Sequence, residues 1–134
     1  MGKKPVECIV VRNKETIARL KPTKSTAPHL SEPAPLAIVV IADGQKSDVW
    51  VEDASIVSIL IQLEAEKLGL GSTWIQLRRR EGDSGPSEEA FRQELGIPEH
   101  YGVLSVVAIG HKNEQKKPYT DADLDFTKVH YETF

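Results

Sequence analysis

Apolar and polar residues alternate in blocks along the chain, and the apolar blocks predict the elements of a layered fold. Leu36 to Ala42 is continuously apolar, which is typical of a strand covered on both faces. The shorter run Glu7 to Arg12, rich in β-branched residues, predicts a buried strand that contains Cys8. Two further runs predict strands over Ser72 to Leu77 and Val103 to Ile109.

One long segment, Asp48 to Leu68, predicts a helix because it lacks glycine and proline and is followed by Gly69. Its apolar residues go almost all the way round the helix: Ala54, Ile56, Val57, Ile59, Leu60, Ile61 and Leu63. A helix that is apolar on every side is buried on every side. One small sheet cannot cover it completely, so we expect part of it to meet a second subunit across a two-fold axis.

Two short helices and two irregular segments complete the pattern. Asn13 can cap a helix to Leu20, and Ser87 can cap one to Leu95 that ends at Gly96. Four prolines make Lys21 to Pro35 a connector. The chain after His111 is polar but ends in an apolar, aromatic segment, which we expect to dock, for example on a partner subunit. The order β-α-β-α-β-α-β-tail predicts a layered α/β or α+β fold with one central sheet.

Composition limits the classes of function. The chain has 134 residues and a formal net charge of −3, which fits one domain and argues against a protein that binds nucleic acid through bulk positive charge. No apolar run is long enough to span a membrane, and no secretory signal follows the basic N-terminus. The single cysteine excludes an intrachain disulfide and a multi-cysteine metal site. We therefore expect a soluble, cytoplasmic protein.

Obvious catalytic side chains are missing from the sequence. The four histidines lack partners at metal-ligand spacing, so no metal site is predicted, and Cys8 lies in an apolar run where a thiol acts as a small hydrophobe. Arg78 to Arg80 is interpreted as a solvated strand end, and Glu64 and Glu66 as solvated or paired with Lys67. An enzyme without an obvious nucleophile, base or metal is possible if a cofactor does the chemistry.

The segment Gly69-Leu70-Gly71-Ser72-Thr73-Trp74 joins the long helix to the next strand. Its two glycines allow backbone conformations closed to other residues and let a flat ligand approach the main chain. A helix cap followed by a tight turn explains the same pattern, and the periodicity alone favours this second interpretation.

Several segments together resemble the FMN-dependent nitroreductase family. They occur in the family's order over nearly the whole chain: Pro5 to Val11, Ala34 to Val40, Glu52-Asp53-Ala54, Leu68 to Trp74, Leu95 to Glu99, Val107 to His111, and Val129-His130-Tyr131. The resemblance implies an α+β sandwich over residues 1–134, with a central mixed sheet flanked by helices. It also implies an intertwined homodimer whose C-terminal arm crosses to the other subunit and whose FMN lies at the interface.

The resemblance also implies the activity and the cofactor site. FMN would take hydride from NAD(P)H and pass electrons to a small-molecule acceptor, a nitroaromatic or a quinone, by a ping-pong scheme without an acid or base side chain. Backbone N–H groups of Leu70, Gly71 and Ser72 would contact the flavin. The family's Asn and Gln positions fall on Gly2 and Lys4, with Lys3 between them, and Lys116 and Lys117 replace its C-terminal basic pair.

One departure from the family supports an alternative. The Arg-Arg-Ser type of motif that holds the FMN phosphate in the family is absent, so the chain looks N-terminally short. Loss of two or three charge-assisted contacts weakens binding by orders of magnitude. The alternative is therefore a truncated or degenerate homologue that dimerises but binds FMN weakly and is not catalytically active.

Overall fold

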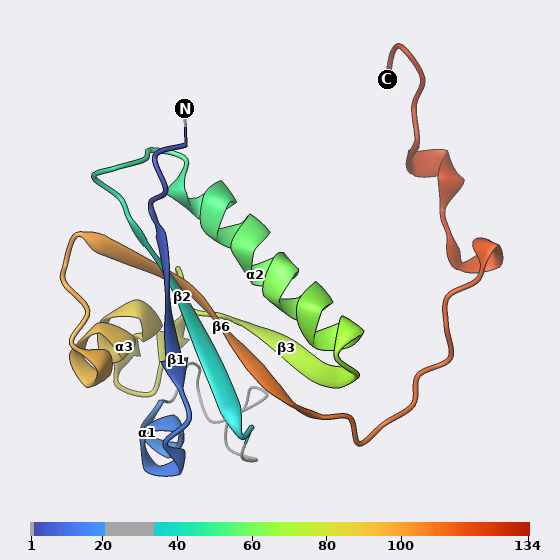
Figure 1. Cartoon of the computed structure of the whole chain (residues 1–134). Helices are drawn as coiled ribbons and strands as arrows, with labels where there is room; N and C mark the ends of the chain where they lie inside the picture. Colours follow the sequence, from blue (N-terminus) through green and yellow to red (C-terminus); the bar gives the residue numbers. More distant parts are fainter. Residues whose placement is uncertain (1, 21–33) are drawn as a thin grey trace.

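A four-stranded sheet forms the centre of the computed structural model, which describes residues 2–20 and 34–134 (Figure 1). The strand order is β1-β2-β6-β3, with β1 at Val6–Val11, β2 at Leu36–Asp43, β6 at Tyr101–His111 and β3 at Leu70–Gln76. The expected connector over residues 21–35 lies mostly outside the described residues.

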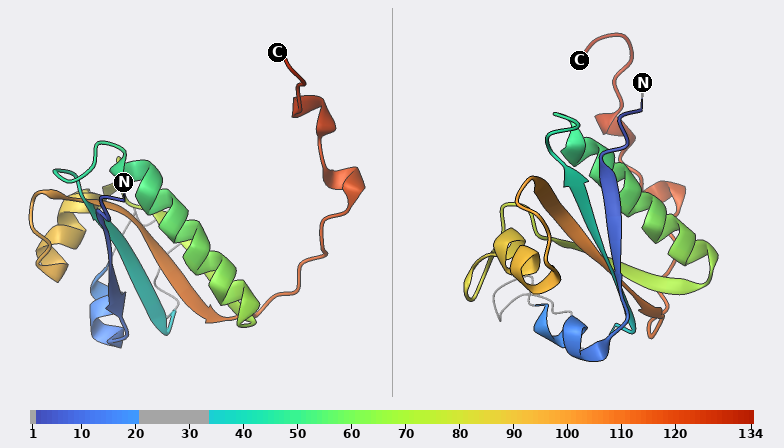
Figure 2. Two further views of the ribbon diagram at one scale, coloured as in Figure 1. Left: turned by 45° about the horizontal axis from the view of Figure 1, so that its top comes forward. Right: turned by 60° about the vertical axis from the view of Figure 1, so that its left-hand side comes forward.

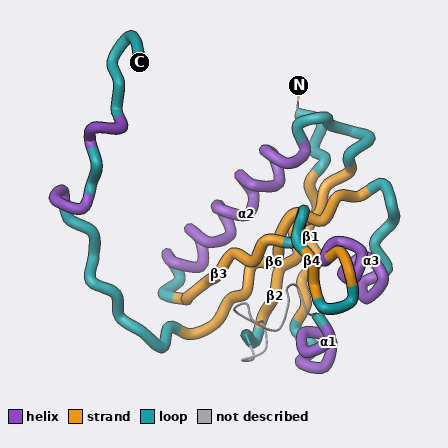
Figure 3. The backbone as a smooth tube through the Cα atoms, turned by 180° about the vertical axis from the view of Figure 1, so that it is seen from behind, coloured by secondary structure: helices purple, strands orange, loops and turns teal. Residues whose placement is uncertain are grey.

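Helices cover both faces of this sheet. Helix α2, Trp50–Lys67, lies along one face, while α1 at Lys14–Arg19 and α3 at Ser87–Leu95 lie on the other (Figures 1 and 3). Successive side chains of β2 point to opposite faces of the sheet and so pack in both layers. Val39 and Ile41 pack with α1 and α3, whereas Val40 and Ala42 pack with α2. The expected α+β architecture is confirmed, with an additional two-residue hairpin of β4, Glu81–Gly82, and β5, Gly85–Pro86.

The strand directions differ from the mixed sheet that was expected. Each of the three strand pairings within this four-stranded sheet is antiparallel. The helix α2 connects β2 to β3, and these two strands run in the same direction. They do not pair with each other because β6 lies between them and runs opposite to both.

The burial of β1 also differs from the sequence prediction. Strand β1 lies at one edge of the sheet, and of its six residues only Val11 is buried. Cys8 is exposed rather than buried. The helix α2 packs mainly over β2, β6 and β3, so the neighbouring part of β1 is left uncovered.

Local signals set several element boundaries as expected. The Asn13 side chain accepts a hydrogen bond from the Thr16 N–H at 2.9 Å and so caps α1. Gly69 and Gly96 have φ values of 75° and 66° at the ends of α2 and α3. Ser87 is the first residue of α3 rather than its cap, a position taken by Pro86.

The segment after β6 extends away from the sheet and helices, as the left view of Figure 2 shows. It contains two short 3₁₀ turns, Asp121–Asp123 and Phe126–Lys128. Large apolar and aromatic side chains along it are exposed: Tyr119, Leu124, Phe126, Val129, Tyr131 and Phe134. The expected irregular tail is therefore present, and within one chain its apolar residues remain uncovered.

Candidate functional site

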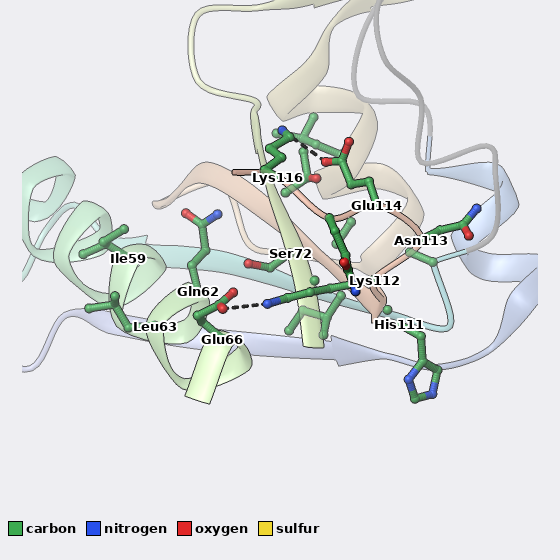
Figure 4. A pocket seen from close by; sticks show the side chains of 18 residues that line it. Ile59, Gln62, Leu63, Glu66, Ser72, His111, Lys112, Asn113, Glu114 and Lys116 are labelled. Carbon is green, nitrogen blue, oxygen red and sulfur yellow. Dashed lines mark hydrogen bonds and ion pairs between the residues drawn. The ribbon is translucent and has the colours of Figure 1, made fainter. Parts of the chain in front are cut away.

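A cleft of about 1040 Å³ lies where the C-terminal half of α2 faces the beginning of β3 and the end of β6 (Figure 4). One wall is formed by Ile59, Gln62, Leu63 and Glu66 of α2. The floor is Gly71, Ser72 and Thr73 of β3, and the chain from His111 to Lys116 closes the remaining side. Apolar side chains, hydrogen-bonding groups and charges thus share one opening, as is usual in ligand sites.

The structure brings some of the expected cofactor residues together here. Gly71, Ser72 and Lys116 line the cleft. Leu70 and Lys117 adjoin these residues in the chain but are not among those that line it. The glycine-containing segment therefore belongs to a cleft as well as to a helix end.

The other expected residues lie at the opposite end of α2. Gly2, Lys3 and Lys4 line a second cleft of about 670 Å³ together with Asp48 and Asp53. The linings of the two clefts reach neighbouring turns of α2, at Ile56 and at Ile59. An 18-residue helix is roughly 27 Å long, however, so Gly2 to Lys4 at its beginning lie far from Gly71 at its end within one chain. The two aspartates balance the two lysines, which leaves the second cleft without a net formal charge from these four side chains.

Gly71 serves the cleft in a different way from the one that the sequence suggests. It lies within β3 and has no positive φ, so its backbone conformation is open to other residues. A Cβ atom at Gly71 would lie 3.3 Å from Cγ of Lys112. The missing side chain therefore provides space, both for the Lys112 stem and for a ligand that approaches the strand.

The edge position of β3 makes some of its backbone groups face away from the sheet. The N–H of Leu77 donates to the carbonyl of Leu104 in β6 at 3.0 Å. Along an antiparallel strand, N–H groups that face the neighbouring strand alternate with N–H groups that face away from it. The N–H of Gly71, like that of Leu77, therefore faces β6, and the N–H groups of Leu70 and Ser72 face the outer side. Two of the three expected backbone donors thus point outward from the sheet.

The lysines of the cleft carry carboxylate partners from the same chain. The Nζ atom of Lys112 lies 2.6 Å from Oε1 of Glu66, and Nζ of Lys116 lies 3.1 Å from Oε1 of Glu114. Lys112 was not predicted from the sequence. Pairing of Leu70 with His111 in the sheet places it next to the end of α2, and sequence alone does not give this register.

Arg78 and Cys8, which the sequence analysis considered for chemical roles, have a structural explanation. The Arg78 guanidinium lies 5.6 Å from the ring centroid of Trp50, so this arginine packs on the beginning of α2. Partial burial raises the pKa of the Cys8 thiol, although the residue is exposed by its accessible surface. A raised thiol pKa lowers the fraction of thiolate and does not favour a nucleophilic role.

The described residues contain neither a cluster of metal ligands nor a membrane-spanning helix. Over residues 2–20 and 34–134, no three His, Cys, Asp or Glu side chains are grouped so that they could bind a metal ion. No helix in the same ranges has both the length and the apolar character needed to cross a membrane.

Comparison with known proteins places the chain in a family. Residues 29–111 match the model of the nitroreductase family. A relative from Archaeoglobus fulgidus, to which an NADH dehydrogenase/NAD(P)H nitroreductase function is assigned by name only, is 36% identical over 98% of this chain and 75% of its own length. The chain therefore belongs to the nitroreductase family, as its sequence motifs indicated.

Solved structures agree with this assignment. An FMN-dependent nitroreductase from Clostridium difficile R20291 is 45% identical and superposes with a TM-score of 0.91, over 97% of this chain and 76% of that one. A nitroreductase from Desulfitobacterium hafniense with bound FMN is 25% identical, with a TM-score of 0.68 over 97% of this chain and 77% of that one. The nitroreductase fold is thus shown over nearly all of the chain, and FMN is the cofactor named for these two relatives.

Proposed function

We propose that this protein is an FMN-dependent NAD(P)H oxidoreductase that reduces nitroaromatic or quinone-type acceptors. The observation that carries the proposal is the cleft beside Gly71 and Ser72, in a chain that is 45% identical to an FMN-dependent nitroreductase. FMN, when bound, would accept hydride from NAD(P)H and then deliver electrons to the acceptor in a ping-pong scheme.

The residues of the cleft fit such a cofactor. Ile59 and Leu63 offer an apolar wall to a flat ring, and Gly71 lets it approach the strand. Backbone N–H groups on the outer side of β3, at Leu70 and Ser72, would donate hydrogen bonds to the ring and favour negative charge on it. Lys116 and Lys117 would neutralise the phosphate, with Lys3 and Lys4 as further cations.

Binding of FMN is the first test of this proposal. Titration of the purified protein, followed by flavin fluorescence, is expected to give submicromolar affinity and turnover with NAD(P)H. Gly71→Val should weaken FMN binding by about tenfold or more, because its side chain would occupy the approach to β3, whereas valine itself suits a strand.

Thr73→Val is the matched control, since Thr73 also lines the cleft but already has a branched side chain of similar size. Its FMN affinity should stay within about twofold of wild type, a change well below the factor of ten that corresponds to 1.4 kcal/mol. Folded protein with no measurable FMN binding would contradict the proposal and favour the inactive homologue.

A homodimer is the second part of the proposal. On the side of α2 away from the sheet, Ile56, Ile59, Leu60 and Leu63 are 57%, 47%, 57% and 58% exposed. Their spacing makes one continuous apolar stripe along the helix. Large exposed apolar stripes of this kind mark interaction surfaces, and a second copy has the same self-complementary stripe.

Dimer formation would also complete the cofactor site. If two α2 helices pack in opposite directions about a two-fold axis, the N-terminal cleft of one copy meets the C-terminal cleft of the other. Gly2, Lys3 and Lys4 would then face Gly71 and Ser72 of the second copy. The exposed aromatic residues of the tail would also be buried against the partner.

Leu60→Glu is expected to separate the two copies. The substitution places two carboxylates in the apolar stripe of the dimer and removes two buried leucines, each contributing about 1.5–3 kcal/mol. The dissociation constant should rise by a thousandfold or more. Mass measured by light scattering after gel filtration should change from two chains to one.

Ala90→Glu is the control, because Ala90 is exposed on α3, on the opposite face of the sheet. This variant should keep the wild-type mass. A monomeric wild type, or a Leu60→Glu protein that remains dimeric at micromolar concentration, would contradict the proposed interface.

A further inference from the structure

Two serines join the middle of α2 to the centre of the sheet. The Oγ atoms of Ser58 in α2 and Ser105 in β6 lie 2.9 Å apart, and both residues are completely buried. The Ser58 hydroxyl also donates to the carbonyl of Ala54, one turn earlier in the helix, at 2.9 Å. Because that bond uses the one proton of the Ser58 hydroxyl, Ser105 is the donor between the two hydroxyls. This serine pair therefore links the helix to the sheet among apolar neighbours.

A bulge in β6 directs Ser105 toward α2. The pairing of β6 with β2 shifts by one residue, so that Val40 lies opposite Ser105 whereas Ile41 lies opposite Val103. Leu104, the extra residue, packs in the cluster on the α2 side of the sheet, and Ser105, which follows it, meets α2 as well. In a regular strand two successive side chains point to opposite faces, and a bulge changes the direction of one of them. The bulge thus provides a hydroxyl beneath α2.

The apolar residues of α2 do not by themselves fix how this helix is rotated about its axis. Its sheet-facing side carries the small buried residues Ala54 and Ala65, whereas the larger Leu60 and Leu63 face away from the sheet. Within one chain, a rotation that turned the leucines inward would bury more apolar surface. Apolar packing of about the right volume does not select one arrangement, whereas a single buried polar contact can specify it. The serine pair supplies such a contact.

We propose that the serine pair holds α2 at the rotation that presents Ile59 and Leu63 to the first cleft and Leu60 to a second copy. The inference rests on the proposed function, since the wall of the cofactor cleft and the apolar stripe of the dimer both lie on this helix. The two serines do not line the cleft and act through α2, so they are positioning residues. The apparent affinity for FMN then follows the fraction of chains that have this rotation.

Ser105→Ala separates positioning from stability. It removes the link to the sheet but leaves the Ser58 hydroxyl bonded to the Ala54 carbonyl, so no donor loses its partner. The midpoint of urea unfolding should therefore stay within about 0.5 M of wild type. The dissociation constant for FMN is expected to rise by about three- to tenfold, the range that the loss of one neutral hydrogen bond supports.

Ser55→Ala is the matched control. The Ser55 hydroxyl donates to the carbonyl of Val51 at 2.7 Å, as Ser58 does to Ala54, but this bond stays within α2. Its FMN affinity should stay within about twofold of wild type. An equal loss of affinity in Ser55→Ala and Ser105→Ala would overturn the inference, because the link to the sheet would then not be the cause.

Ile61→Cys reports the rotation of α2 without flavin. Ile61 is half-buried and packs with the two clusters between α2 and the sheet. The substitution is made together with Cys8→Ser, so that position 61 carries the one thiol of the chain. Addition of Ser105→Ala should speed the reaction of this thiol with a soluble thiol reagent by about three- to tenfold, because a turned helix exposes it. Addition of Ser55→Ala should leave the rate unchanged.

The outcomes separate this inference from the proposed function. It is overturned if Ser105→Ala changes the urea midpoint but neither the thiol reaction nor FMN affinity, or if the thiol reacts faster while FMN affinity stays the same. A wild-type protein that binds no FMN overturns the proposed function, and the thiol reaction rates then decide whether the serine pair fixes α2. Normal FMN binding with an unchanged thiol reaction rate in Ser105→Ala overturns the inference alone.

Discussion

Replacement of Phe91 by alanine is expected to lower the free energy of unfolding by about 3–5 kcal/mol, the range for a buried phenylalanine. Phe91 lies on α3, is fully buried, and packs in the cluster that includes Val39 of β2 and Ile17 of α1. Its ring therefore joins three elements on the face of the sheet opposite α2, and alanine would leave a cavity among them. Urea unfolding followed by circular dichroism measures the change.

Phe91→Leu is the control, because leucine fills most of the same space and keeps the site apolar. It should cost less than about 1.5 kcal/mol, as volume-conserving changes do. A loss below about 1 kcal/mol in Phe91→Ala would contradict the packing described for α3.

Gly102→Ala is expected to destabilise the protein by about 3 kcal/mol, at the upper end for overpacking of a core. A Cβ atom at Gly102 would lie 2.2 to 2.7 Å from three atoms of the Trp50 ring. The ring cannot move away freely, since Arg78 lies on it and Gly44 is close to its edge. The substitution would push the beginning of α2 away from β6.

Gly44→Ala is the matched control for this prediction. An added Cβ at Gly44 would meet the same ring at 3.7 Å, an ordinary contact distance, so its effect should stay below about 1 kcal/mol. Gly102→Ala should also cost much less when Trp50 is leucine. Equal effects at both glycines would show that the clash with Trp50 is not the cause.

The structural features that the sequence predicts best are those that depend on one continuous segment. The apolar run of β2 and the glycine-free helix α2 were predicted because their patterns are long. Asn13 and Gly96 set helix ends through local hydrogen bonds and backbone conformation, which depend on few neighbours. The exposed stripe of α2 was also foreseen, since its apolar residues exceed what one sheet can cover.

Features that depend on strand pairing could not be foreseen. The burial of Cys8 was predicted wrongly because the edge position of β1 follows from the strand order and not from its composition. Lys112 meets Glu66 across 46 residues through the pairing of β3 with β6, and Gly102 faces Trp50 for a similar reason. The sequence predicts the eight cofactor residues as one set, whereas the structure divides six of them between two clefts and places Leu70 and Lys117 in the lining of neither.

The most direct test of the central claim is the reduction of protein-bound flavin. FMN is added to the purified protein without oxygen, the unbound flavin is removed, and NADH or NADPH is then added while the visible absorption band is followed. We predict that the bound flavin is bleached in a one-to-one reaction and that a nitroaromatic or quinone restores the band. Bound flavin that neither nicotinamide bleaches, or folded protein that retains no flavin, would contradict the account.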